Sequence, residues 1–167
     1  MRRVFVLDNH KQPLMPCVPA RARQLLKKGK ASVYRRFPFT IILNERVGGN
    51  AQPTELKFDP GSKTTGTSLV VHGKNTSRVV WCAELSHRSR NIVEALIARR
   101  AIRRSRRNRK TRYRKPRFLN RTRKDKWLPP SIQSRVDNIV AITRKLQSFT
   151  PLSSLACEVV KFDTQKL

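Results

Sequence analysis

Residues 55–72 read ELKFDPGSKTTGTSLVVH. The strand-forming runs Glu55–Asp59 and Gly66–His72 lie on either side of a Pro-Gly turn, which predicts a hairpin. Val79–Leu85 is a third run of this kind, so residues 55–85 are expected to form a meander of strands. The hairpin leaves Asp59 at the end of an apolar strand, beside the turn.

A long helix and a fourth strand follow the meander. Apolar residues recur at helical spacing from Ile132 to Leu146, and Pro151 ends the pattern. The next run, residues 155–160, is expected to be a strand buried on both faces except at Glu158. This order of elements is that of the ribonuclease H type of α/β fold, in which the first and fourth strands lie side by side.

Asp59 and Glu158 would then face one cleft. An ionised acid in an apolar strand costs several kcal/mol unless it is paired or binds a metal. Two carboxylates suit Mg²⁺, which activates a water and stabilises the leaving oxygen in phosphodiester cleavage. Simpler explanations stay open, because Asp is common before Pro-Gly turns and Glu158 has 38 Lys and Arg residues to pair with.

The N-terminal 48 residues are expected to form a separate small α+β module. Arg3–Leu7 is strand-forming, and residues 13–16, PLMP, are expected to be a rigid turn. Pro19 begins a short helix that Gly29 ends. Strands are expected at 31–34 and 39–43, with Val33, Phe39 and Ile41 in the core.

The charge of the chain is concentrated in one segment. Lys and Arg number 38 against 10 acidic residues, a net charge of +28. Residues 99–126 hold 16 of these cations with Asp125 as the single acid, so this segment carries +15. It has no apolar stripe, so a helix there would need a partner other than protein to cover it.

A polyanionic partner is therefore expected, and nucleic acid fits better than a membrane surface. No apolar run reaches the ~18 residues of a membrane span. The three cysteines form no CxxC pair, so a zinc site is not expected. The expected nucleic-acid-binding residues are Arg99, Arg100, Arg103, Arg104, Arg106, Arg107, Arg109, Lys110, Arg112, Arg114 and Arg117.

Four motifs together resemble the IscB family, including its relative IsrB, of transposon-associated RNA-guided nucleases. PLMP at 13–16 in its N-terminal context resembles the PLMP module of that family. FDPGSKTTG at 58–66 resembles the first RuvC motif, and RRSRR at 103–107 resembles the RRxRR signature of the bridge helix. WLPPS at 127–131 and EVVKFD at 158–163 resemble the approach to the second RuvC motif and its core.

The resemblance divides the chain into four parts. These are a PLMP module at 1–48, first RuvC strands at 49–86, an arginine-rich bridge helix and basic loop at 87–126, and a second RuvC helix and strand at 127–167. It implies an incomplete ribonuclease H-like (RuvC) α/β fold, interrupted by the bridge helix. It also implies a location in the prokaryotic cytoplasm, at the nucleoid.

The resemblance further implies guide RNA and target DNA as partners. Guide RNA would lie along the bridge region, and the PLMP module would bind the RNA scaffold. Five basic residues of the module suit that second role, namely Lys27, Lys28, Lys30, Arg35 and Arg36. Asp59 and Glu158 would hold Mg²⁺ at a RuvC endonuclease site.

A complete IscB continues into an HNH domain and a third RuvC motif with further acids. The sequence here ends at Leu167, so we expect it to cut DNA weakly or not at all by itself, unless a second chain supplies those parts. Two alternatives are a non-catalytic RNA-binding transposon remnant and one half of a split nuclease. An unrelated ribosomal-type basic protein would leave the paired acids unexplained.

Overall fold

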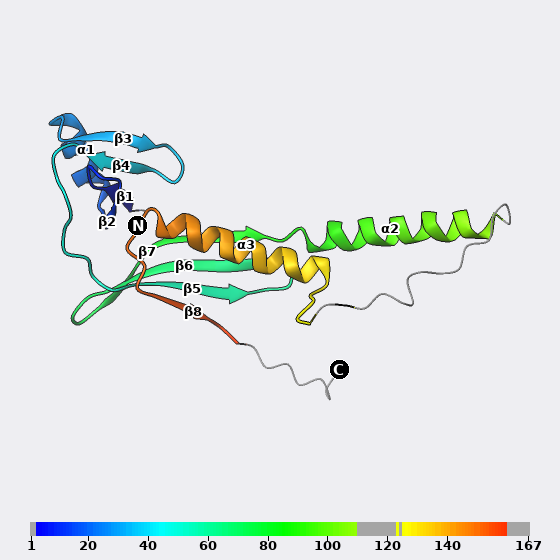
Figure 1. The fold of residues 1–167 in the computed structure, drawn as a ribbon. Coiled ribbons are helices and arrows are strands. Elements are labelled where there is room, and N and C mark those ends of the chain that lie inside the picture. The colour runs from blue at the N-terminus through cyan, green and yellow to red at the C-terminus, as the bar shows by residue number, and fades with distance from the viewer. Residues whose placement is uncertain (1–2, 110–122, 124, 160–167) are drawn as a thin grey trace. The chain divides into compact units, whose positions relative to one another are not determined.

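The computed structural model describes residues 3–109, 123 and 125–159, and it is a mixed α/β protein with two four-stranded sheets (Figure 1). The described residues form two compact units, one of residues 3–86 with 140–159 and one of residues 87–109, 123 and 125–139. Both sheets lie in the first unit.

The first sheet is built from residues 4–43 and has the strand order β2-β1-β4-β3. Its elements are β1 (Val4–Leu7), β2 (Pro13–Cys17), α1 (Pro19–Lys27), β3 (Ala31–Arg35) and β4 (Thr40–Leu43). Helix α1 ends as predicted at a glycine with positive φ, Gly29. The side chains of Ala22 and Ile41 are buried between α1 and the sheet.

The second sheet has the order β7-β6-β5-β8. Its strands are β5 (Thr54–Pro60), β6 (Thr64–His72), β7 (Ser77–Ser86) and β8 (Ser154–Cys157). The predicted meander is confirmed, since β5, β6 and β7 pair antiparallel in succession. The expected pairing of the first and fourth strands is also confirmed, because β5 and β8 are parallel neighbours.

Two helices complete the described structure, α2 (Ser89–Asn108) and α3 (Pro130–Gln147). The part of α3 from Val140 onward lies across one face of the second sheet (Figure 1). Leu56 of β5, Leu69 of β6 and Leu146 of α3 are at most 1% exposed and form the centre of this core. The opposite face of the sheet is open.

Three local expectations are wrong. Residues 13–16 form part of strand β2 and not a turn. Strand β2 lies at the edge of its sheet, so the missing N–H groups of its prolines remove few hydrogen bonds between strands. Strand β8 is not buried on both faces, because it too is an edge strand, and Leu155 is 59% exposed. Val33 and Phe39 are 53% and 40% exposed and lie outside the core.

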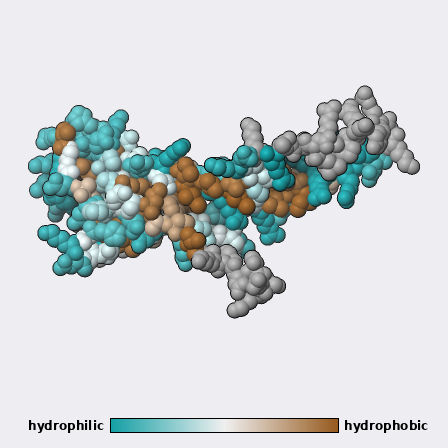
Figure 2. Space-filling view, turned by 60° about the horizontal axis from the view of Figure 1, so that its bottom comes forward, coloured by the Kyte–Doolittle hydropathy of each residue, from teal (hydrophilic) through white to brown (hydrophobic). Residues whose placement is uncertain are grey.

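The surface therefore retains apolar side chains. Figure 2 shows hydrophobic residues (brown) on the face that it presents, within a mainly hydrophilic surface. Val159 and Phe37 are the most exposed large hydrophobic residues of the described chain, at 83% and 86%. Among the described residues, no helix is long and apolar enough to cross a membrane.

Candidate functional site

Asp59 and Glu158 lie side by side at the carboxyl ends of two parallel strands. Phe58 of β5 pairs with Cys157 of β8, and each acid is the next residue along its strand direction. The N–H of Glu158 donates to the carbonyl oxygen of Phe58 at 3.0 Å, which is a ladder bond of this last pair. The sheet thus brings together the two acids predicted from sequence.

Both acids belong to the open face of the sheet. Along β5 the side chains of Leu56 and Phe58 are buried beneath α3, and Asp59 points to the other face because successive strand residues alternate. Glu158 directly follows Cys157, the partner of Phe58, and it lines the same hollow as Asp59. Neither carboxylate is buried, so neither carries the desolvation cost that the sequence suggested.

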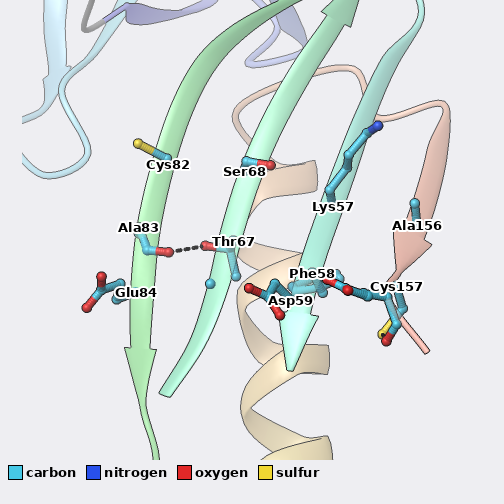
Figure 3. A pocket seen from close by; sticks show the side chains of 12 residues that line it. Lys57, Phe58, Asp59, Thr67, Ser68, Cys82, Ala83, Glu84, Ala156 and Cys157 are labelled. Atoms are coloured by element: carbon cyan, nitrogen blue, oxygen red, sulfur yellow. Dashed lines mark hydrogen bonds between the residues drawn. The ribbon is translucent and has the colours of Figure 1, made fainter. Parts of the chain in front are cut away.

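A shallow hollow of about 640 Å³ surrounds this pair (Figure 3). It contains a third carboxylate, Glu84 of β7, which the sequence analysis missed. Gly66 of β6 pairs with Asp59 on one side and with Glu84 on the other. A Cβ at Gly66 would lie 3.8 Å from Oδ2 of Asp59, in ordinary van der Waals contact with that side chain.

The carboxylate oxygens of Asp59 and Glu158 are the kind of ligand that a hard cation prefers, but they are too few to hold one without further ligands. Mg²⁺ is commonly held by one or two carboxylates together with waters and substrate phosphates, and Asp59 and Glu158 supply such a pair on an accessible face. Among the described residues, no three His, Cys, Asp or Glu side chains are grouped closely enough to hold a metal by themselves. Glu84 lines the same hollow as the pair.

A chain of hydrogen bonds occupies the other end of the same face. Nε2 of His72 lies 3.1 Å from Oε2 of Glu55, and Nδ1 of His72 lies 2.9 Å from Oγ of Ser77. Nζ of Lys57 lies 3.2 Å from the same Glu55 oxygen. The hydrogen bonds from Lys57 and His72 lower the pKa of Glu55, so this carboxylate is already satisfied within the protein.

Helix α2 carries the arginines expected to bind nucleic acid. Arg99, Arg103 and Arg106 follow one another at i, i+4 and i+7, and Arg100, Arg104 and Arg107 repeat that spacing on the adjacent strip. Arg109 directly follows the helix. Lys110, Arg112, Arg114 and Arg117 lie outside the described residues.

The other side of α2 is small and apolar, which corrects the expectation of no apolar stripe. This strip follows the spacing i, i+1, i+4, i+5 and i+8, and its members are Ile97, Ala98, Ala101, Ile102 and Ser105. Ile97 and Ile102 are 61% and 54% exposed. The guanidinium groups are therefore gathered on one arc of the helix, where they can line a polyanion.

The basic residues predicted in the N-terminal module lie at the two ends of β3. Lys27, Lys28 and Lys30 surround the turn that follows α1, whereas Arg35 ends β3 and Arg36 begins the turn into β4. The guanidinium carbon of Arg35 lies 5.5 Å from the ring centre of Phe149, so Arg35 also has a contact within the protein.

The described chain thus combines an α/β sheet, which carries two acids at the ends of neighbouring parallel strands, with an arginine-lined helix. The family model of RRXRR proteins matches residues 4–167, and the chain belongs to that family. The family is the domain associated with IscB and RuvC nucleases. No curated protein matches the chain.

Proposed function

We propose that this chain is the N-terminal portion of an RNA-guided DNA endonuclease of the IscB type. In this proposal the chain binds guide RNA and the RNA–DNA heteroduplex through α2, and it contributes Asp59 and Glu158 to a Mg²⁺-dependent RuvC site. Family membership supports the association with RNA-guided nucleases. The single observation that carries the catalytic part is that Asp59 and Glu158 line one hollow at the ends of the parallel strands β5 and β8.

The arginines of α2 have the role of holding backbone phosphates. Each planar guanidinium can donate two hydrogen bonds to a phosphate, and such contacts recognise helix shape and not base sequence. Base pairing by the guide then supplies the sequence specificity, as in other RNA-guided effectors. Arg99, Arg103 and Arg106 are exposed along one arc of α2, which suits contacts with the backbone and not with the bases.

Asp59 and Glu158 have the role of holding the cation beside the scissile phosphate. When bound, Mg²⁺ would polarise the phosphodiester and lower the pKa of a bound water. The open face around Gly66 leaves room for a nucleic-acid backbone to approach both carboxylates. Two carboxylates form an incomplete site, so DNA cleavage requires further acids from a third RuvC motif, on a longer or second chain.

The metal-binding step can be tested on this chain directly. We expect Mn²⁺, a paramagnetic substitute for Mg²⁺ with the same preference for oxygen ligands, to bind at the carboxylate pair. The decrease in the free Mn²⁺ spectrum by electron paramagnetic resonance measures this binding. Asp59→Asn and Glu158→Gln should each abolish it, whereas Glu45→Gln, at an exposed linker acid, should leave it unchanged.

Because both carboxylates are exposed, neither substitution should alter thermal unfolding, which separates loss of the site from loss of the fold. Mn²⁺ binding that survives both Asp59→Asn and Glu158→Gln would refute the carboxylate site. Absence of any Mn²⁺ binding to the wild-type chain would refute it equally.

A further inference from the structure

The tip of the β3–β4 hairpin displays three aromatic rings to solvent. Tyr34 is 44% exposed, Phe37 86% and Phe39 40%, all within six residues of chain. Residues 36–39 form the turn between the two strands (Figure 1). Sequence patterning alone placed Phe39 in the core, so this cluster is visible only in the structure.

The tip is held in place by its base. Ile41 of β4 is fully buried, and the N–H of Phe5 donates to the carbonyl oxygen of Phe39 at 3.1 Å. Within the turn, Oγ1 of Thr40 donates to the carbonyl oxygen of Pro38 at 2.9 Å. The backbone at Phe39 is therefore fixed to the sheet while its ring stays partly exposed.

The charge around these rings has one sign. Residues 27–43 contain five Lys and Arg residues and no acidic residue. Arg35 and Arg36 stand between Tyr34 and Phe37 in the chain. Arg35 packs on Phe149, 5.5 Å from its ring centre, and anchors the hairpin, whereas Arg36 is exposed beside Phe37. Exposed aromatic rings that lie close in sequence to two arginines combine the two features that bind single-stranded nucleic acid.

We propose that the hairpin tip, residues 34–39, is a base-stacking site for unpaired nucleotides. Phe37 stacks on a base, Tyr34 and Phe39 extend the apolar surface, and Arg36 contacts the adjoining phosphate. This deepens the proposed function, on which it rests, by assigning the N-terminal module a ligand different from that of α2. The helix holds backbone phosphates, and the hairpin holds exposed bases of a loop or single strand.

Paired nucleic acid does not fit this site. The bases of a duplex are stacked on each other and offer no free face to Phe37, whereas unpaired bases can be splayed onto aromatic rings. A protein partner would have to tolerate the two arginines of the tip, Arg35 and Arg36, and residues 27–43 offer no acid to balance them. The charge pattern therefore favours a nucleic-acid strand.

Binding of the full chain to a 5′-labelled oligouridine tests the proposal by fluorescence anisotropy. We expect Phe37→Leu, which keeps an apolar side chain and removes the ring, to weaken binding about tenfold, within the usual range for loss of one base–aromatic stack. Phe37→Tyr keeps the ring and should bind as the wild type does. An RNA duplex of equal length should bind wild type and Phe37→Leu equally.

Deoxythymidine strands of the same length separate the two sources of unpaired bases. A loss with RNA alone assigns the site to RNA, and a loss with both assigns it to single strands of either kind. Photo-crosslinking of 4-thiouridine RNA should also mark the tryptic peptide of residues 37–46, FPFTIILNER.

Equal single-strand affinities for Phe37→Leu and wild type would overturn the proposal, as would an equal loss on the duplex. Either result would overturn only the proposal for the hairpin tip. The proposed function would still hold if substitutions of the α2 arginines weaken RNA binding. Because Phe37 is 86% exposed, unchanged thermal unfolding should confirm that Phe37→Leu folds.

Discussion

The carboxylate of Asp8 joins two distant parts of the N-terminal module. Oδ1 accepts a hydrogen bond from the N–H of Gln12 at 2.7 Å, and Oδ2 accepts one from the N–H of Gly48 at 2.9 Å. The side chain is 1% exposed, and Gly48 has a positive φ that suits glycine. Asp8 therefore closes a loop across 40 residues of sequence.

Substitution of Asp8 should change stability in a pH-dependent way. The hydrogen bond from Gly48, followed by that from Gln12, lowers the pKa of Asp8 below its ordinary value of 3.8. A lowered folded-state pKa means that the stabilisation is complete above pH 3.8 and is lost as the pH falls through the lower folded-state value. We expect Asp8→Asn to melt at a lower temperature than wild type at pH 7, because the amide has one acceptor oxygen for two N–H donors.

The difference in melting temperature between Asp8→Asn and wild type should shrink steadily below pH 3.8. Glu45→Gln, at an exposed acid of the same module, should melt as wild type does throughout. A difference that stays constant from pH 7 down to pH 2 would show that the charge of Asp8 contributes nothing.

At the scale of the elements, α3 has one end that stabilises the fold strongly. Leu146, near its C-terminal end, is 1% exposed, and Phe149 just beyond the helix is 3% exposed. The ring centre of Phe149 lies 6.1 Å from that of Phe5, so residues after α3 also pack on β1 of the first sheet. Val140 on the same helix is 40% exposed.

Substitutions along α3 should therefore differ sharply in cost. Leu146→Ala should lower the free energy of unfolding by about 2–5 kcal/mol, because it leaves a cavity in the core. Val140→Ala should cost below about 1 kcal/mol, since the side chain is already largely in water. Urea unfolding followed by circular dichroism measures both. Equal costs for the two variants would contradict the packing of α3 on the sheet.

Local signals were enough to predict much of the fold. The periodicity of α3, the Gly29 end of α1 and the Pro-Gly turn after Asp59 all depend on neighbouring residues, and the structure confirms each. The position of a strand within its sheet depends on distant partners instead. For that reason the prediction of a turn at β2 and the prediction of a buried strand at β8 were both wrong.

In the candidate site too, local sequence reveals some of the residues, and the position of the others depends on distant strands. Asp59 and Glu158 could be singled out because each is an acid in an apolar run. Glu84 could not, because its place beside Gly66 depends on the register of β6 and β7, which no local pattern reveals. The exposed rings at the hairpin tip were missed because an apolar run does not show that Tyr34 lies on an edge strand, nor that Phe37 and Phe39 lie in the turn before β4.

For the whole molecule, with its net charge of +28, the described residues present two kinds of basic surface. The arginines of α2 lie on one arc of a helix, where they can follow a phosphate backbone. Arg35 and Arg36 of the first module lie next to aromatic residues on a hairpin. The proposed function depends most on the first surface, since an RNA-guided protein must hold its nucleic acid by the backbone.

The salt dependence of binding to a 20-base-pair RNA–DNA heteroduplex tests this claim most directly. Contact with about eight phosphates predicts a slope of log K against log salt near −7. Replacing Arg99, Arg103 and Arg106 with Gln, which preserves helix propensity, should make the slope shallower by about 2 to 3. A control with Lys11, Lys74 and Arg78 changed to Gln loses the same charge from exposed positions outside α2 and should keep the wild-type slope. A wild-type slope near zero, or an equal change in the control, would contradict the assignment of α2 as the phosphate-binding surface.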